Sequence, residues 1–203
     1  MIINRELLKK VTGCDYYDGQ VLHSRFAYKF FRDKTLPIGN IIAFRAPMKV
    51  EAQGMIDEED LINNDFIYSD DAISFIWEIP NLDAFGAIAY QRLLNTQIGN
   101  LLSLKYLKAP IEIDGDDLMV HKEHNQGGVS QLKGKCSVSI SYTKNNTALG
   151  HTGINVVAGK QAPAFAFSTN LSDADAESFM KDVIDVFYRM NDDIFIATTK
   201  LTL

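Results

Sequence analysis

Three runs of sequence decide the fold, and they read Gly115-Asp-Asp-Leu-Met-Val120, Lys135-Cys-Ser-Val-Ser-Ile-Ser-Tyr142 and His151-Thr-Gly-Ile-Asn-Val156. Successive side chains of a β-strand face opposite ways. The middle run therefore sets Lys135, Ser137, Ser139 and Ser141 against Cys136, Val138, Ile140 and Tyr142. The last run separates His151, Gly153 and Asn155 from Thr152, Ile154 and Val156. Two such neighbouring strands would share an apolar face for a core and a polar face, which is either solvated or the floor of a binding site.

Length and composition are those of one ordinary globular domain. The chain has 203 residues, of which 46% are hydrophobic and 23% charged. That length is enough for one well-buried core, so we expect a single domain over residues 1–203. The formal net charge of -6 argues against a nucleic-acid groove, and we expect no nucleic-acid partner.

Cysteine usage and the absence of long apolar runs indicate a cytoplasmic protein. Cys14 and Cys136 form no CxxC pair, and buried free thiols fit a reducing compartment. The first residues lack the apolar core of a signal peptide, and no segment has the length of a membrane span. We expect no membrane contact.

The order of predicted elements favours an α+β fold. Helices are expected over Arg5–Val11, from a cap at Asn81 or Asp83 to about Leu104, and after a cap at Ser172. The acidic run Asp57–Asp60 opens a short helix or is a solvated turn. Strands are expected over Asn40–Ala46, Ala72–Ile79, 111–121, 135–142, 151–157, 162–168 and Ile194–Leu201. Since strands and helices do not alternate regularly, we predict a mixed, largely antiparallel sheet flanked by helices.

Lys135 is the first candidate for chemistry. On a face of hydroxyls its ammonium would be available to a carboxylate or phosphate of a ligand. The alternative is an exposed lysine at a strand end, as expected for Lys133. Gln91 and Arg92 lie in the middle of a predicted helix, where a solvated face is the default.

Two groups of residues have the composition of metal ligands. Asp114, Asp116 and Asp117 would repel one another unless a cation neutralised them, and carboxylates suit Mg²⁺. An Asp-Gly hairpin turn explains the same residues equally well. His121 and His124 have a metal-like spacing, but their polar loop makes a specific site the less favoured reading.

Seven short motifs, in register from about Asp15 to Lys200, resemble a conserved family of bacteria and archaea, domain of unknown function 366. They are Asp18-Gly-Gln-Val-Leu22, Ala43-Phe-Arg-Ala-Pro47, Phe75-Ile-Trp-Glu78, Gln91-Arg-Leu-Leu94, Gly115-Asp-Asp-Leu118, Lys135-Cys-Ser-Val-Ser-Ile140 and His151-Thr-Gly-Ile-Asn155. That family is grouped by fold with biotin and lipoate protein ligases and, more distantly, with class II aminoacyl-tRNA synthetase catalytic domains. The resemblance implies a biotin/lipoate-ligase-like fold.

The same resemblance implies residue roles. Lipoate ligases carry an Asn-Asp-Leu strand, a Gly-Lys-x-Ser-Gly-Ser-Ala strand and a His-Gly strand, to which Asp116-Asp-Leu118, Gly134–Ser139 and His151-Thr-Gly153 are similar. In those ligases the lysine contacts the acyl carboxylate and the adenylate phosphate, a role that would fall to Lys135. The Asn-Asp segment lies near nucleotide and Mg²⁺, which would place Asp116 or Asp117 there. ATP and Mg²⁺ are implied by the resemblance alone.

The chain also departs from the ligase pattern. It lacks the basic triple-glycine loop that covers the nucleotide, and the acidic, aromatic stretch Asn64–Asp70 stands in the equivalent place. Val138 stands where the ligases have a glycine, after the first serine of the lysine strand. Its side chain leaves less room for a ligand to approach the backbone closely. These departures favour a binding module that has lost the chemistry.

The leading hypothesis is a ligase or transferase that forms an acyl or amide bond on a small carboxylate, with an adenylate as the implied intermediate. The expected catalytic residues are Lys135, Asp117 and His151, the metal ligands Asp116 and Asp117, and the substrate contacts Arg45, Glu78, Arg92, Ser137, Ser139 and Asn155. The alternative is a non-catalytic small-molecule binding module with the same cleft. A third reading is a structural or dimerising protein, and a homodimer is left open in each case.

Overall fold

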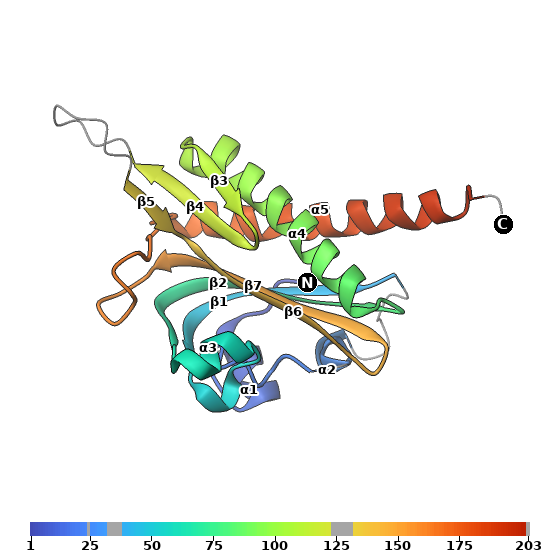
Figure 1. Ribbon diagram of the computed structural model, residues 1–203, viewed down its shortest axis with the longest axis horizontal. Helices are drawn as coiled ribbons and strands as arrows, with labels where there is room; N and C mark the ends of the chain where they lie inside the picture. The colour runs from blue at the N-terminus through green and yellow to red at the C-terminus, as the bar shows by residue number, and fades with distance from the viewer. Residues whose placement is uncertain (24, 32–37, 123–131, 202–203) are drawn as a thin grey trace.

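The computed structural model describes residues 1–203 except 24, 32–37, 123–131 and 202–203. A four-stranded antiparallel sheet lies at its centre, in the order β1 (Asn40–Val50), β2 (Ile67–Pro80), β7 (Thr147–Val157) and β6 (Ser137–Lys144). Three short helices, α1 (Arg5–Thr12), α2 (Phe26–Phe31) and α3 (Glu58–Asn63), cover one face (Figure 1). The long helices α4 (Ala84–Leu101) and α5 (Asp173–Thr198) cover the other. The predicted α+β class with an antiparallel sheet is confirmed.

A second, smaller sheet lies on the α4 side of the molecule. Its strands are β3 (Ile111–Asp114), β4 (Asp117–Lys122) and β5 (Leu132–Lys135), all antiparallel. The chain passes from this sheet to the large one at Cys136, whose N–H donates to Leu118 and whose carbonyl accepts from Asn155. The strand predicted over 135–142 is therefore two strands that meet at one buried residue.

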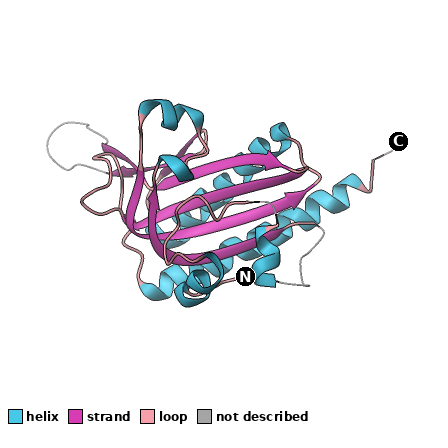
Figure 2. Cartoon of the chain, turned by 90° about the horizontal axis from the view of Figure 1, so that it is seen from below, coloured by secondary structure: helices cyan, strands magenta, loops and turns pink. Residues whose placement is uncertain are grey.

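Both faces of the large sheet are buried in apolar cores. On the side of α4 and α5 the core includes Phe75, Trp77, Phe179 and Phe187. On the side of the short helices it includes Ile42, Phe44, Met48, Tyr17 and Phe26. Figure 2 shows helices on both sides of the sheet. Both faces of the sheet therefore contribute to apolar cores.

Strand pairing corrects the predicted polar face. Ser139 lies opposite Thr152, and Ile140 lies opposite His151. Directly opposed residues share a face of the sheet, so the serines of β6 face α4 together with Thr152. His151, Gly153 and Asn155 lie on the other face, with Val138 and Ile140. The alternation within each run was correct, but the two polar sets do not combine.

Several predicted helices are present with the expected caps. The side chains of Asp57, Asp83 and Ser172 accept backbone N–H groups at the starts of α3, α4 and α5. After Leu101 the helix continues as a π-helical segment, Leu102–Leu107. None of the described helices is long and apolar enough to span a membrane.

Three strand predictions were wrong in detail. The segment Ile194–Leu201 continues α5 as far as Thr198, because no helix-breaking residue precedes its β-branched run. Residues 162–168 form only a single bridge, between Lys135 and Ala166. The strand predicted to end at Ala46 continues through Pro47 to Val50. Its pairing with β2 shifts register between Ala46 and Met48, so that no backbone N–H is required at Pro47.

Candidate functional site

Lys135 forms an ion pair with Asp117 at the edge of the molecule. Their Nζ and Oδ1 atoms are 2.8 Å apart, with side chains 29% and 31% exposed. The pairing of β4 with β5 sets Lys135 opposite Met119, two residues after Asp117 on the same strand face. The backbone of Lys135 also exchanges hydrogen bonds with Phe165 and Phe167. The lysine is thus held by β4 on one side and by residues 165–167 on the other, and it presents a partly exposed ammonium.

Helix α4 adds two polar side chains to this pair. Arg92 Nη2 lies 3.3 Å from Asp116 Oδ1, and Arg92 Nη1 donates to Gln91 Oε1 at 2.6 Å. Gln91 Nε2 in turn donates to Ser139 Oγ at 2.8 Å. We call Gln91, Arg92, Asp116, Asp117 and Lys135 the polar cluster. It joins α4, β4 and β5 along the outer strand β6.

Sequence reasoning missed the buried part of this network. Asn95 donates to the carbonyl of Asp116 at 3.0 Å and accepts from Thr152 Oγ1 at 2.8 Å. Gln91 and Asn95 are both buried, one helical turn apart, although a solvated face was the default for Gln91. The signal that was missed is the spacing of the two side-chain amides. Gln91 and Asn95 are four residues apart, on the otherwise apolar inner face of the helix.

The two acidic residues of the cluster have different environments. Burial raises the pKa of Asp116, while Arg92 opposes the shift and Asp117 adds to it. Each carboxylate already has its own basic partner, Arg92 for Asp116 and Lys135 for Asp117. Mutual repulsion is therefore offset without a metal ion.

No group of three potential ligands converges on a metal site within the described part of the chain. His121 instead hydrogen-bonds Glu112 at 3.0 Å. His124 lies outside the described residues. The ion-paired Asp116 and Asp117 do not fit a metal centre of their own.

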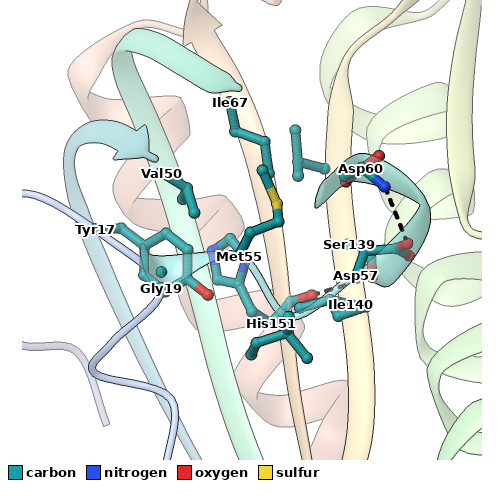
Figure 3. Close-up of a pocket in the computed structure, with 13 residues that line it drawn as sticks. Tyr17, Gly19, Val50, Met55, Asp57, Asp60, Ile67, Ser139, Ile140 and His151 are labelled. Carbon is teal, nitrogen blue, oxygen red and sulfur yellow. Dashed lines mark hydrogen bonds between the residues drawn. The ribbon is translucent and has the colours of Figure 1, made fainter. Parts of the chain in front are cut away.

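A small pocket of about 50 Å³ opens on the face of the sheet that carries α3. Its apolar lining residues include Val50, Met55, Ile67, Val138 and Ile140, and polar and acidic side chains line it as well. Figure 3 shows Tyr17 and His151 close together, with Asp57 and Asp60 on the opposite side of the pocket. Ser139 lines the pocket and also bonds Gln91, so strand β6 separates the pocket from the polar cluster by one strand's width.

His151 is a buried, neutral residue of the pocket wall. Its ring stacks on Tyr17 with centroids 3.7 Å apart, and Nε2 lies 3.1 Å from Ser74 Oγ. Burial lowers its pKa to about 3. The imidazole therefore carries no charge at neutral pH and lies on the sheet face away from Lys135's serine neighbours.

Asp60 connects the pocket electrostatically with Lys135. Burial raises the pKa of Asp60, repulsion from Asp57 and Asp65 adds to the shift, and Lys135 opposes it. A carboxylate of the pocket wall and the ammonium of Lys135 thus lie near each other.

The structure does not bring the remaining predicted residues to Lys135. Arg45 lies on β1, the far edge strand, where it binds Asp71 and Asp173 at 2.7 Å each. Glu78 accepts the backbone N–H groups of Arg25 and Ala27, at the start of α2.

Two more of the predicted substrate contacts, Ser137 and Asn155, are buried. Ser137 accepts the N–H of Leu118 at 2.8 Å and so fastens β4 to β6. Asn155 is buried on β7, where its N–H donates to the carbonyl of Cys136, the residue after Lys135, and its side-chain oxygen has no hydrogen-bond partner among the described residues. The expected site therefore separates into the polar cluster with its neighbours on β6 and β7, and the more distant Arg45 and Glu78.

The solved structures similar to this chain include one that matches over most of its length and others with low TM-scores. A protein of unknown function from Pyrococcus horikoshi superposes with a TM-score of 0.78 at 25% identity, over 93% of each chain. P. falciparum LipL1 in complex with lipoate matches with a TM-score of 0.46 at 14% identity, over 75% of this chain and 49% of that one. A bipartite lipoate protein ligase from Thermoplasma acidophilum gives 0.44 at 11% identity, over 71% and 69%.

No curated protein is significantly similar to the chain in sequence. The family model described as "Domain of unknown function (DUF366)" matches residues 9–202, nearly the whole chain. This protein therefore belongs to the DUF366 family.

Proposed function

We propose that the protein binds a small organic acid, with its apolar part in the pocket and its carboxyl group at Lys135. An activated form of that acid, in which the carboxyl group is bonded to a leaving group, would pass its acyl group to a nucleophilic acceptor, and the leaving group would depart with the electrons of the broken bond. One observation carries the proposal: a strand-held lysine with a partly exposed ammonium lies near Asp60, which lines the pocket. Asp117 occupies only one of the three donors of that ammonium. The others can bind a carboxylate.

Lys135 would act by electrostatics in the reaction. When a carboxylate is activated or attacked, negative charge gathers on its oxygens, and a fixed cation lowers the cost of that charge. Strand pairing and the Asp117 contact keep the ammonium in place, so little reorganisation is needed. Arg92, 40% exposed at its side chain, is the second cation within the polar cluster.

The proposal takes no step through a metal ion or a nucleotide. Asp116 and Asp117 are already paired with bases, and the stretch Asn64–Asp70 is acidic rather than basic. Adenylate formation is therefore the part of the hypothesis that experiment must decide.

The second candidate is a binding module without catalysis. It is favoured by the state of His151, which is neutral, stacked on Tyr17 and bonded to Ser74. With a pKa lowered to about 3, the imidazole of this third predicted catalytic residue is a weak base.

Isothermal titration with octanoate, lipoate and biotin tests the proposal, with and without ATP and MgCl₂. We expect one of these carboxylates to bind, and Lys135→Ala to weaken its binding roughly tenfold or more, because a hydrogen bond to a charged group contributes about 1.5–3 kcal/mol. Lys133→Ala is the matched control, since Lys133 lies two residues away and pairs with Glu112.

A parallel assay of pyrophosphate release separates the two candidates. Release that depends on the bound carboxylate and is lost in Lys135→Ala supports the ligase. Binding without release or acyl transfer supports the binding module. If none of the carboxylates binds, or if both lysine variants behave alike, the role of Lys135 is wrong.

A further inference from the structure

Arg92 belongs to a series of polar contacts that closes on itself. Its Nη2 pairs with Asp116 Oδ1 at 3.3 Å, and its Nη1 donates to Gln91 Oε1 at 2.6 Å. Gln91 Nε2 donates to Ser139 Oγ at 2.8 Å, and Ser139 Oγ lies 3.2 Å from Thr152 Oγ1. The contacts therefore lead from a charged pair at the edge of the molecule to the hydroxyls of the large sheet.

Asn95 completes the circuit. Thr152 Oγ1 donates to Asn95 Oδ1 at 2.8 Å, and Asn95 Nδ2 donates to the carbonyl of Asp116 at 3.0 Å. We call this closed set of contacts the polar ring. Its members are Gln91, Arg92 and Asn95 of α4, Asp116 of the turn before β4, Ser139 of β6 and Thr152 of β7. The ring thus joins one helix, two strands and one turn.

Most of the ring is buried, yet it ends at an exposed cation. Gln91, Asn95 and Thr152 are 2%, 0% and 0% exposed. Replacing both partners of a buried hydrogen bond by apolar groups of the same shape is often nearly neutral for stability. The side chain of Arg92, by contrast, is 40% exposed. The ring is therefore suited to fixing a charge that a ligand can reach, in addition to holding elements together.

Arg92 and Lys135 lie near the same carboxylate. Burial raises the pKa of Asp116, and the charges of both Arg92 and Lys135 oppose that shift. Lys135 in turn binds the next residue, Asp117, at 2.8 Å. Of the five N–H donors of a guanidinium, the ring engages only the two terminal nitrogens, each through one contact. The other N–H groups of Arg92 can bind an anion beside Lys135.

We propose that the polar ring holds Arg92 as a second anchor for the carboxyl group bound at Lys135. The positioning residues are Gln91, Asn95, Ser139 and Thr152. A guanidinium that is fixed in advance loses less side-chain freedom when the ligand binds. Ser139 also lines the pocket, so the ring connects the wall around the apolar part of the ligand with the cation at its carboxyl group (Figure 3). The inference rests on the proposed function, since it takes the carboxyl group at Lys135 as given.

Two substitutions of Thr152 test the inference, with the binding of octanoate, lipoate and biotin measured by isothermal titration. Thr152→Val keeps the shape of the side chain and removes the hydroxyl, whereas Thr152→Ser keeps the hydroxyl and removes a methyl group. We expect Thr152→Val to bind the carboxylate about three- to tenfold more weakly than the wild type, as for one long side chain no longer held in advance. Thr152→Ser should bind it like the wild type. A residue that served only packing would show the opposite order.

Further variants show whether the effect passes through Arg92. Arg92→Ala should weaken binding at least as much as Thr152→Val, and adding Thr152→Val to it should weaken binding no further, because the side chain that the ring holds is gone. Gln91→Leu breaks the ring at a second point and should act like Thr152→Val. Ser141→Ala is the control, because Ser141 is a buried serine of β6 whose hydroxyl bonds two backbone carbonyls outside the ring. The melting temperature of each variant confirms that it folds.

The outcomes separate this inference from the proposed function. If the wild type binds none of the three carboxylates, the proposed function itself fails. If it binds one, and Thr152→Val binds as tightly or Thr152→Ser loses as much affinity as Thr152→Val, the inference is overturned and the carboxylate site at Lys135 stands. An undiminished effect of Thr152→Val in the Arg92→Ala background would overturn the role of Arg92.

Discussion

His151 is a titratable residue that is buried in the wall of the pocket. His151 stacks on Tyr17, touches Ser74 through Nε2 and has almost no exposed surface. A neutral imidazole tolerates this environment, but an imidazolium would lose its hydration without gaining an opposite charge. The residue is therefore tied to the stability of the fold at acid pH.

The sign of that effect follows from the direction of the shift. Burial lowers the pKa of His151 to about 3 in the folded state, below its value in the unfolded chain. The stabilisation that results is complete above about pH 6.5 and is lost progressively as the pH falls from there towards 3. We expect this one group to reduce the free energy of unfolding by about 1.4 kcal/mol per pH unit in that window.

Urea unfolding at pH 7, 6 and 5 measures this dependence. In His151→Phe, which keeps a stacked ring, the slope should be shallower than in the wild type, whatever its absolute stability. His121→Phe is the control, because His121 lies on β4 beside Glu112. Parallel curves for His151→Phe and the wild type would contradict the assignment.

At the scale of single elements, local sequence predicts the helices well and the sheet contacts poorly. The caps at Asp57, Asp83 and Ser172 act within three residues of themselves, so they can be read directly from the chain. The face of β7 that carries His151 depends on its register with β6, which is set by non-local pairing. A shift of one residue reverses that face, and the predicted polar floor failed for this reason.

The same distinction explains which site residues the sequence could identify. Lys135 and Asp117 are brought together by two adjacent strands of one small sheet, and both were predicted. Arg45 and Glu78 were predicted for the same site, but their partners come from distant segments, Asp173 on α5 and the start of α2. Asp60 and Tyr17 were not predicted as site residues because neither belongs to a short motif that indicates a site.

The cap of α5 can be tested as an element. Ser172 Oγ accepts the N–H of Asp175 at 3.1 Å and donates to its carboxylate at 2.7 Å. Ser172→Ala should lower the free energy of unfolding by about 1 kcal/mol, the usual effect of losing such a cap. Chemical denaturation measures this change, with Ser178→Ala within the same helix as the control. An equal loss in both variants would count against a role for the cap.

At the scale of the molecule, α5 extends beyond the body of the protein. Figure 1 shows its C-terminal end projecting past the sheet. From Asp192 onward its described residues are exposed, including Ile194, Phe195 and Ile196. A groove beside this end is lined by Leu93 of α4 and by Val186, Arg189, Met190, Asp193 and Ile194 of α5.

The homodimer that the sequence leaves open stays a prediction. The exposed end of α5 and the groove beside it are the surface through which we expect two copies to pack. Neither Arg189 nor Asp193 has an ion-pair partner within the described chain. If a second copy of α5 packs antiparallel near Met190, Arg189 lies opposite Asp193 of that copy. Such a contact is self-complementary, as a two-fold dimer requires.

Light scattering coupled to gel filtration measures the mass of the particle. The wild type should be a dimer, and Ile194→Asp or Arg189→Asp should be monomeric. The double variant Arg189→Asp/Asp193→Arg should dimerise again because it restores the opposite charges. Phe66→Asp is the control, because Phe66 is exposed between α3 and β2 and does not line the groove. This substitution should leave the mass of the particle unchanged. A monomeric wild type would refute this dimer.

The crossing at Cys136 has a consequence for how the family can vary in length. Lys135 belongs to one sheet and Ser137 to the other, and the single residue between them is hydrogen-bonded to both sheets. Inserting or deleting one residue here would turn the serines of β6 towards Tyr17 and their apolar neighbours towards α4. Relatives should therefore differ in length in their loops, while the distance along the chain from the lysine to the serines stays fixed.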